Sequence, residues 1–175
     1  MIITLEENKY YHIYNRGINS CNLFDNNHDY SYFLMLAKRY LSPVSNIYAY
    51  ALMLNHFHFV IKFNSNLEKP THQYLSNLFN AYTKAYNLWN NRHGALFERP
   101  FRRKMLTETD DVLRAILYVN NNPIKHEIVR RLDDYKWNSF PINSNNDEFI
   151  AKDELFEIFS GEKVFIDYHN QENGS

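Results

Sequence analysis

Strand-like and helix-like segments alternate along this chain in an order that few folds accommodate. Strands, rich in β-branched and aromatic residues, are predicted over residues 9–15, 47–53, 56–63 and 95–105, and helices with apolar side chains at helical spacing over 29–41 and 71–91. The last strand is irregular or at an edge, because Pro100 interrupts it. The order strand, helix, strand, strand, helix, strand is the βαββαβ pattern of a ferredoxin-like α+β sandwich. We therefore expect an antiparallel sheet with helices on one face, followed by C-terminal helices.

The same patterns predict where the helices begin and end. Asp29 is expected near the start of the first helix as a cap, and Thr71 as the N-cap of the second. Further helices are predicted over 107–121, about 124–131 and Asp153–Phe159, with Pro123 limiting the first of these. The rest of the tail is expected to fray.

The first group of residues with chemical potential is His56-Phe57-His58. Side chains alternate between the two faces of a strand, so His56 and His58 point the same way while Phe57 points to the core. Two imidazoles on one face of a rigid strand can chelate one divalent ion. The plainer alternative is a pair of histidines with only structural contacts.

The second group lies on the helix predicted over 107–121. Asp111, Arg114, Tyr118 and Asn122 follow one polar line at helical spacing, beside an apolar stripe. A phenol on such a face can attack a phosphodiester if a metal ion polarises the phosphate. Asn122, one turn after Tyr118, could add an oxygen ligand to that metal. With 14 tyrosines in the chain, an ordinary structural tyrosine is the alternative.

The third group is a basic run interleaved with Phe97 and Phe101. Its members are Arg92, His93, Arg99, Arg102, Arg103 and Lys104, and Arg16 in the loop after the first strand could join them. Cations bind phosphates and exposed aromatic rings stack on bases, so the run is typical of a single-stranded nucleic-acid site. A solvated sheet edge with two core phenylalanines is the alternative.

Charge is unevenly distributed along the chain. Residues 145–175 carry eight acidic side chains and two lysines, a net charge of −6, whereas the other 144 residues carry 17 basic and 12 acidic side chains, a net charge of +5. A mildly basic body suits a polyanionic partner. No run of eighteen apolar residues predicts a membrane span, and the N-terminus lacks the pattern of a secretory signal. With the single Cys21, these features favour a cytoplasmic location.

Five ordered segments carry a family resemblance. They are YHIYNRG, ALMLNHFHFVI, HGALFERPFRRKML, LRAILYVNNNPIKHEIV and YKWNSF, and they span roughly residues 9–140. Together they resemble the REP-associated tyrosine transposases, a branch of the single-tyrosine HUH transposases. The resemblance implies a 1–140 catalytic domain of ferredoxin-like fold, followed by an acidic C-terminal extension over 141–175.

The resemblance also implies a reaction. A Mg²⁺ or Mn²⁺ ion would be held by His56 and His58, with Asn122 at the position of a third ligand and Asn55 at the polar position before the first histidine. Tyr118 would attack the scissile phosphate of single-stranded DNA, next to a hairpin or palindromic repeat. The product would be a 5′-phosphotyrosine and a free 3′-OH, as needed for DNA transposition.

Two other functions stay open at this stage. One is a domesticated DNA-hairpin-binding protein without transposition, and the other is an RNA-binding ferredoxin-like module whose sheet aromatics stack on bases. The retained His56, His58, Tyr118 and Asn122 favour cleavage. The REP-associated branch favours a monomer over a homodimer.

Overall fold

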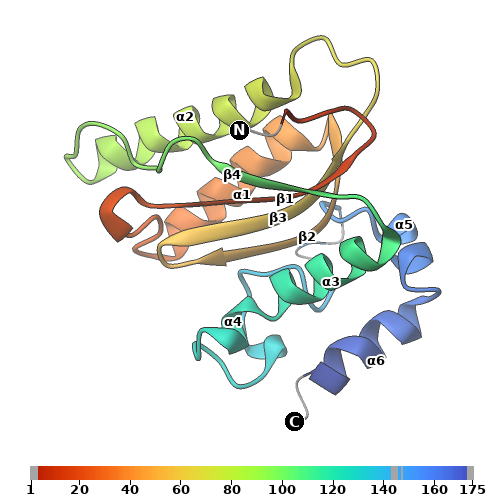
Figure 1. Ribbon diagram of the computed structural model, residues 1–175. Coiled ribbons are helices and arrows are strands. Elements are labelled where there is room, and N and C mark those ends of the chain that lie inside the picture. Colours follow the sequence, from red (N-terminus) through yellow and green to blue (C-terminus); the bar gives the residue numbers. More distant parts are fainter. Residues whose placement is uncertain (1–3, 143–145, 147, 173–175) are drawn as a thin grey trace.

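The computed structural model describes the chain over residues 4–142, 146 and 148–172 (Figure 1). The strands are β1 (Tyr10–Arg16), β2 (Ser45–Met53), β3 (His56–Phe63) and β4 (Arg102–Leu106). They form one antiparallel sheet in the order β2-β3-β1-β4. With the first and third strands in the centre, this order confirms the predicted ferredoxin-like α+β fold.

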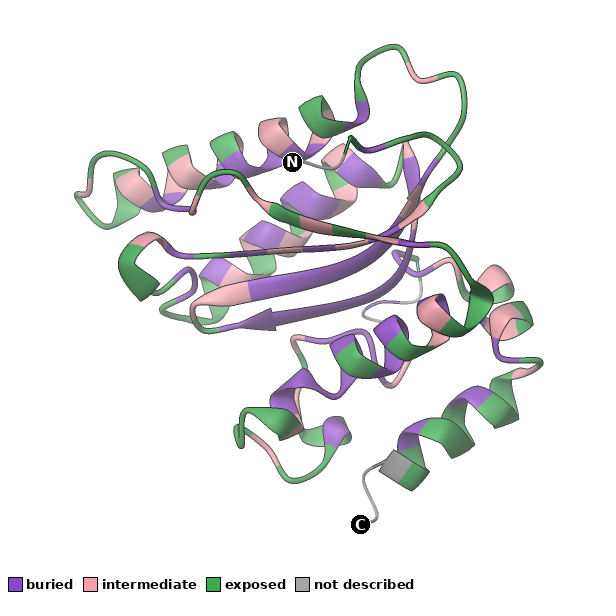
Figure 2. Cartoon of the chain, in the orientation of Figure 1, coloured by how far each residue is buried: buried purple, intermediate pink, exposed green. Residues whose placement is uncertain are grey.

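Two helices cover one face of the sheet, α1 (Asn27–Leu41) and α2 (Thr71–Trp89) (Figure 1). Every second residue of β3 points toward them, as strand alternation requires. The Phe57 ring lies 5.2 Å from that of Phe33 in α1 and 5.4 Å from that of Phe79 in α2, between ring centroids. These aromatic contacts form the centre of the core, which Figure 2 shows as the buried strands and the inner sides of both helices.

The opposite face of the sheet is also covered, by α3 (Thr109–Asn120), which contacts β2, β3 and β4. This helix buries Val112, Ile116 and Val119, while Tyr118 keeps 43% of its surface exposed. The single helical layer expected from the sequence therefore consists of α1 and α2, and α3 adds a layer on the second face. The face of the sheet that α3 covers is the one that bears His56 and His58.

Several predicted boundaries differ from the structure. Asn26, and not Asp29, caps α1, because its side chain accepts hydrogen bonds from the His28 and Asp29 amides. Thr71 does not cap α2, because its hydroxyl donates to the Leu5 carbonyl at 2.6 Å. The prediction of a helix over 124–131 was wrong. A shorter helix, α4 (Asn122–Lys125), has Pro123 in its first turn, and Glu127 soon after it has a positive φ of 56°.

The acidic C-terminal segment packs against the body of the protein. It contains α5 (Lys152–Ile158) and α6 (Glu162–Glu172). Two short 3-10 helices lie earlier in the chain: η1 (Ile18–Ser20) follows β1, and η2 (Leu132–Asp134) follows α4. The Glu154 carboxylate accepts hydrogen bonds of 2.6 Å from both Asn46 and Tyr48 in β2, and pairs with Lys62 at 3.5 Å. Part of the negative charge of the segment is thus neutralised by contacts with the sheet. Within the described residues no helix is long and apolar enough to cross a membrane.

Residues expected to fray form α6, which is attached through one buried histidine. The His169 ring lies 4.3 Å from the ring of Phe140, nearly parallel to it. Its Nε2 is 2.9 Å from the Asn120 amide nitrogen at the end of α3, and its Nδ1 is 2.7 Å from the Phe165 carbonyl. The contact with Asn120 joins α6 to α3, the packing of His169 and Phe165 on Phe140 fixes α6 to the preceding loop, and the contact with the Phe165 carbonyl orients the ring within α6.

This attachment should make the protein sensitive to acid. Burial lowers the pKa of His169 from 6.5 to about 4, although the Phe165 carbonyl opposes the shift. Between these two values the unfolded chain binds a proton that the folded chain does not, so stability falls as the pH drops from about 6.5 to about 4. The expected loss from this group is about 3 kcal/mol in the free energy of unfolding.

Denaturant unfolding at a series of pH values measures this loss. His169→Gln should lower stability at pH 7 but make its decline between pH 6.5 and 4 shallower than in the unmodified protein. An equally steep decline in the variant would show that His169 does not cause it.

Candidate functional site

Neighbouring strands bring a polar group together on the α3 side of the sheet. In β3, His56 and His58 lie on one face, and β1 pairs Arg16 with His56 and Tyr14 with His58. The rings of His56 and His58 are perpendicular, with centroids 5.3 Å apart. The predicted convergence of the two imidazoles on one face is what the strand register produces.

Each of these histidines has one ring nitrogen occupied by a protein partner. His56 Nδ1 is 2.8 Å from Asn55 Oδ1, and His58 Nδ1 is 2.9 Å from His12 Nε2. A proton on each Nδ1 satisfies both contacts and leaves each Nε2 with a lone pair. This is the arrangement that orients histidine ligands in metal sites, where the second nitrogen binds an outer partner.

Burial keeps this cluster uncharged. It lowers the pKa of His58 to about 2, with further contributions from His12, His56 and His126. The pKa of His56 falls to about 4 through burial and His126, while Asn122 opposes the shift. Burial and the nearby Lys104 lower the pKa of His12 to about 4 as well. At neutral pH all three rings are therefore neutral, the state in which imidazole binds metals.

Tyr118 extends from α3 over these rings. Its ring centroid lies 5.8 Å from those of both His12 and His58, in edge-on geometry. The Nζ atom of Lys125 in α4 lies 4.3 Å from the centre of the Tyr118 ring, within the range of a cation–π contact. The phenol is thus beside the histidines, partly exposed, and next to a positive charge.

Asn122 supplies the strongest sign that an ion fits this site. Its Oδ1 atom is buried and makes no well-formed hydrogen bond, although the Asn122 side chain lies close enough to the His56 ring to raise the pKa of that ring, and its Nδ2 donates to the Tyr118 carbonyl at 2.9 Å. An unpaired buried oxygen costs roughly 1–3 kcal/mol unless something else satisfies it. No group of three or more His, Cys, Asp or Glu side chains within the described residues is arranged to hold a metal. Two imidazoles and this amide oxygen are a donor set that suits a divalent ion.

The predicted basic run is split between two sides of the sheet. Arg102 and Lys104 of β4 pair with Tyr14 and His12 of β1, so they share the face of the histidines with Arg16. Arg103, between them, points to the opposite face, and Arg99 lies in the preceding loop. Arg92 follows α2 and donates to Asn87 Oδ1 and the Ala95 carbonyl, both at 2.9 Å.

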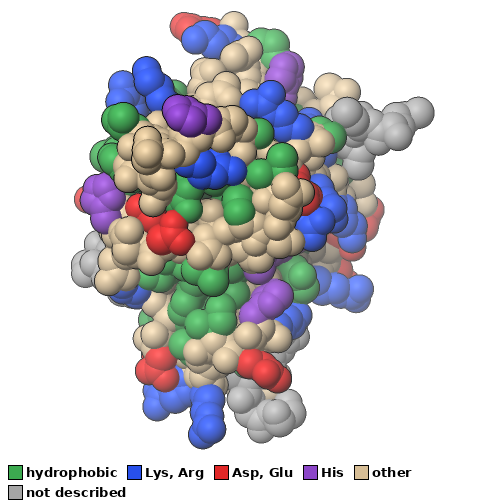
Figure 3. Space-filling view, turned by 90° about the vertical axis from the view of Figure 1, so that its left-hand side faces the viewer, with side chains coloured by type: hydrophobic (Ala, Val, Ile, Leu, Met, Phe, Trp, Pro, Cys, Tyr) green, Lys and Arg blue, Asp and Glu red, His purple; other side chains and the backbone are tan. Residues whose placement is uncertain are grey.

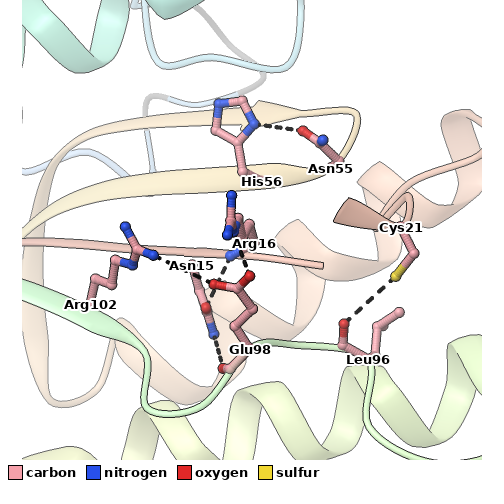
Figure 4. A network of polar contacts seen from close by, with 8 residues as sticks. All are labelled: Asn15, Arg16, Cys21, Asn55, His56, Leu96, Glu98 and Arg102. Carbon is pink, nitrogen blue, oxygen red and sulfur yellow. Dashed lines mark hydrogen bonds and ion pairs between the residues drawn. The ribbon is translucent and has the colours of Figure 1, made fainter. Parts of the chain in front are cut away.

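An acidic side chain reduces the positive charge beside the histidines. The Glu98 carboxylate forms a 2.5 Å bond to Arg16 Nε and lies 3.7 Å from Arg102 Nη2 (Figure 4). Figure 3, which looks at the end of the sheet, shows basic, acidic, histidine and hydrophobic side chains interspersed on that surface. Glu98 therefore offsets part of the positive charge of Arg16 and Arg102 beside the histidines.

Sequence reasoning missed four residues here: His12, Lys125, His126 and Glu98. The ring of exposed His126 lies 4.9 Å from that of His56. Alternation puts His12 on the same face of β1 as Tyr14, but its contact with His58 depends on how β1 pairs with β3, which no local pattern encodes. The contacts of Glu98, Lys125 and His126 depend on loop and helix placement, and no local pattern encodes that.

Comparisons with known proteins support the fold. No protein-family model and no curated protein sequence matches the chain. A solved structure of a REP-associated tyrosine transposase bound to a REP hairpin is similar, with a TM-score of 0.66 over 80% of this chain and 81% of that chain, at 15% sequence identity. A bacterial tRNA(His) guanylyltransferase-like protein in complex with ATP overlaps with a TM-score of 0.46, at 13% identity over 92% of this chain and 74% of that chain. The resemblance noted in the sequence is thus confirmed at the level of the fold.

Proposed function

We propose that this protein cleaves and rejoins single-stranded DNA through a covalent bond to Tyr118. A Mg²⁺ or Mn²⁺ ion would be held by His56, His58 and Asn122. The observation that carries the proposal is the placement of a partly exposed tyrosine beside two neutral histidines and a buried amide oxygen that makes no well-formed hydrogen bond. Each feature alone is common, but a nucleophile next to a suitable ligand set is what phosphoryl transfer requires.

The proposed reaction conserves the phosphodiester bond. The Tyr118 oxygen attacks the scissile phosphorus and loses its proton, and a 5′-phosphotyrosine forms as the bond to the 3′ oxygen breaks. That oxygen takes up a proton and leaves as a 3′-OH, and attack by another 3′-OH reverses the step and joins the strands. The bound ion would supply Lewis-acid polarisation of the phosphate.

The residues around Tyr118 have separate tasks in this reaction. Asn55 and His12 orient His56 and His58 through their Nδ1 atoms. Lys125 holds the Tyr118 ring and adds positive charge beside the phosphate. Arg16, Arg102 and Lys104 would bind flanking phosphates of the strand.

The direct test is formation of a covalent adduct. The protein is incubated with labelled DNA hairpins that carry unpaired flanks and with Mn²⁺, and a denaturing gel then reveals any protein that carries label. The hairpin is chosen because the structural neighbour was solved with one. We expect an adduct that requires Mn²⁺. If the protein bound these hairpins but formed an adduct with none of them, the proposal would be refuted.

Binding without cleavage is the second candidate function. The observation in its favour is Glu98, which pairs with Arg16 and Arg102 where an active enzyme needs cations for its substrate. It predicts a hairpin complex that forms equally well with a chelator present and never becomes covalent.

Glu98 itself gives a prediction that applies to both functions. Glu98→Gln should release Arg16 and Arg102 for phosphates and raise DNA affinity several-fold at low salt. The dependence of affinity on salt should become steeper, because each extra contact with a phosphate of a single strand adds about 0.7 to the slope. Anisotropy titrations from 50 to 200 mM salt measure both quantities. Unchanged affinity and slope would mean that these arginines do not contact DNA.

A further inference from the structure

A cavity lies on the face of the sheet opposite the histidines, between α2 and the loop that leads into β4. This cavity, here called the Phe101 pocket, has a volume of about 780 Å³. Phe79, Phe97, Phe101, Arg99 and Arg103 line it, with amide and hydroxyl groups from α2 at Asn80 and Thr83. The volume lies within the roughly 300–1,000 Å³ of ordinary ligand sites. The reaction at Tyr118 makes no use of it.

The lining combines aromatic rings with one stacked guanidinium. The Phe79 ring lies 5.2 Å from that of Phe97 and 5.5 Å from that of Phe101. The Arg103 guanidinium carbon lies 3.9 Å from the centre of the Phe101 ring. Phenyl rings and flat guanidinium groups are the surfaces on which nucleobases stack in single-stranded nucleic-acid sites.

One donor atom of Arg103 has no hydrogen-bond acceptor. Its Nε atom is buried and has no hydrogen-bond partner. Burial lowers the pKa of this guanidinium, which reflects the cost of placing a cation there. A ligand that brings an oxygen or ring-nitrogen acceptor would remove that cost. A nucleotide has both features that this pocket suits, a flat base that can stack and oxygen or ring-nitrogen acceptors for Arg103.

The pocket is connected to the Tyr118 site by the edge strand. β4 lies at one end of the sheet order, and its residues alternate between the two sites, with Arg102 and Lys104 on the histidine face and Arg103 in the pocket. Glu98 lines the pocket, and its carboxylate holds Arg16 and Arg102 beside the histidines (Figure 4). A DNA strand that passes around this edge would reach both sites.

We propose that the Phe101 pocket binds one unpaired nucleotide of the same DNA strand whose phosphate is presented to Tyr118. Its base stacks on the partly exposed Phe101–Arg103 pair, with the buried Phe79 and Phe97 rings behind it, Arg103 Nε donates to an acceptor on the base or its phosphate, and Arg99 lies at the rim for the next phosphate. This inference rests on the proposed function for its ligand. It assigns to the pocket the recognition of unpaired DNA that flanks a hairpin.

The test compares two DNA ligands with the full chain in the presence of EDTA, so that binding is measured without metal-dependent cleavage. One ligand is a blunt hairpin, and the other is the same hairpin with four unpaired nucleotides on either its 5′ or its 3′ side. The flanked hairpin should bind about tenfold more tightly on one of the two sides. Phe101→Ala and Arg103→Lys should each remove most of that gain and leave blunt-hairpin affinity unchanged.

Arg103→Lys keeps the charge and loses the flat stacking surface, so it tests the pocket even if Phe101→Ala does not fold. Lys104→Gln, on the opposite face of β4, is the matched control and should weaken both hairpins by the same factor. Equal affinity for flanked and blunt hairpins, or equal losses for both in Arg103→Lys, would overturn the inference. So would tighter binding of free dAMP than of the flanked hairpin, which would assign the pocket to a free nucleotide.

Failure here and failure of the proposed function are distinguishable. A covalent adduct with Mn²⁺, together with flank-independent binding, rejects the pocket alone. Flank-dependent binding that responds to Arg103→Lys, without any adduct, rejects only the chemistry. Absence of binding to every hairpin rejects both.

Discussion

Tyr118→Phe should abolish the covalent protein–DNA adduct while the protein still binds DNA. The variant lacks only the oxygen that would attack phosphorus, and removal of a catalytic nucleophile lowers the rate by about a thousandfold or more. The side chain is 43% exposed and its ring contacts are retained in phenylalanine. The free energy of unfolding should therefore change by less than about 0.5 kcal/mol. A denaturing gel with labelled DNA reports the adduct, and anisotropy reports binding.

Tyr14→Phe is the matched control for this experiment. Tyr14 lies on the same face, with its ring 5.6 Å from that of His58, and so is the second tyrosine within reach of the histidines. Because it belongs to β1 and not to the polar line of α3, it should keep adduct formation within a few-fold of the unmodified protein. Loss of the adduct in Tyr14→Phe with full activity in Tyr118→Phe would transfer the role of nucleophile to Tyr14.

The part of the site that the sequence predicts best is the part set by local periodicity. β3 has the predicted bounds of 56–63, because large apolar side chains at every second position, Phe57, Phe59, Ile61 and Phe63, mark both its length and its core face. Helical spacing likewise separates Tyr118 from the buried stripe of α3. Both results need only the order of neighbouring residues, which the sequence contains in full.

The parts that could not be predicted depend on contacts between distant segments. The His12–His58 contact joins residues 46 apart and follows from the β1–β3 register. Alternation alone places Arg103 opposite Arg102 and Lys104, but which of these faces bears the histidines follows from the pairing of β4 with β1. Helix α6 forms because His169 finds Asn120 and Phe140, whereas its own sequence is only weakly amphipathic. Tertiary packing decided each of these outcomes.

His56→Ala should remove both Mn²⁺ binding and Mn²⁺-dependent cleavage. The ring is held by Asn55 with its Nε2 directed away from that contact, and one of the two proposed imidazole ligands would be lost. Since replacement of an outer partner already costs about 10–100-fold in metal affinity, loss of a direct ligand should cost more than about a hundredfold. The EPR signal of free Mn²⁺ in titrations measures affinity without reference to activity. EDTA should abolish the adduct of the unmodified protein, and added Mn²⁺ should restore it.

His126→Ala provides the contrast that makes this prediction specific. Its ring is 4.9 Å from His56, but it is exposed at the end of α4 and lacks a partner role like that of Asn55 or His12 among the contacts described above. We expect its Mn²⁺ affinity to stay within about threefold of the unmodified protein, because the His56, His58 and Asn122 donors remain. If His56→Ala bound Mn²⁺ normally and His126→Ala did not, the ligand set would have to be redrawn around α4. The assignment of Tyr118 as nucleophile would be unaffected by that result. Its ring contacts both Lys125 of α4 and His58 of β3, so it lies beside either ligand set.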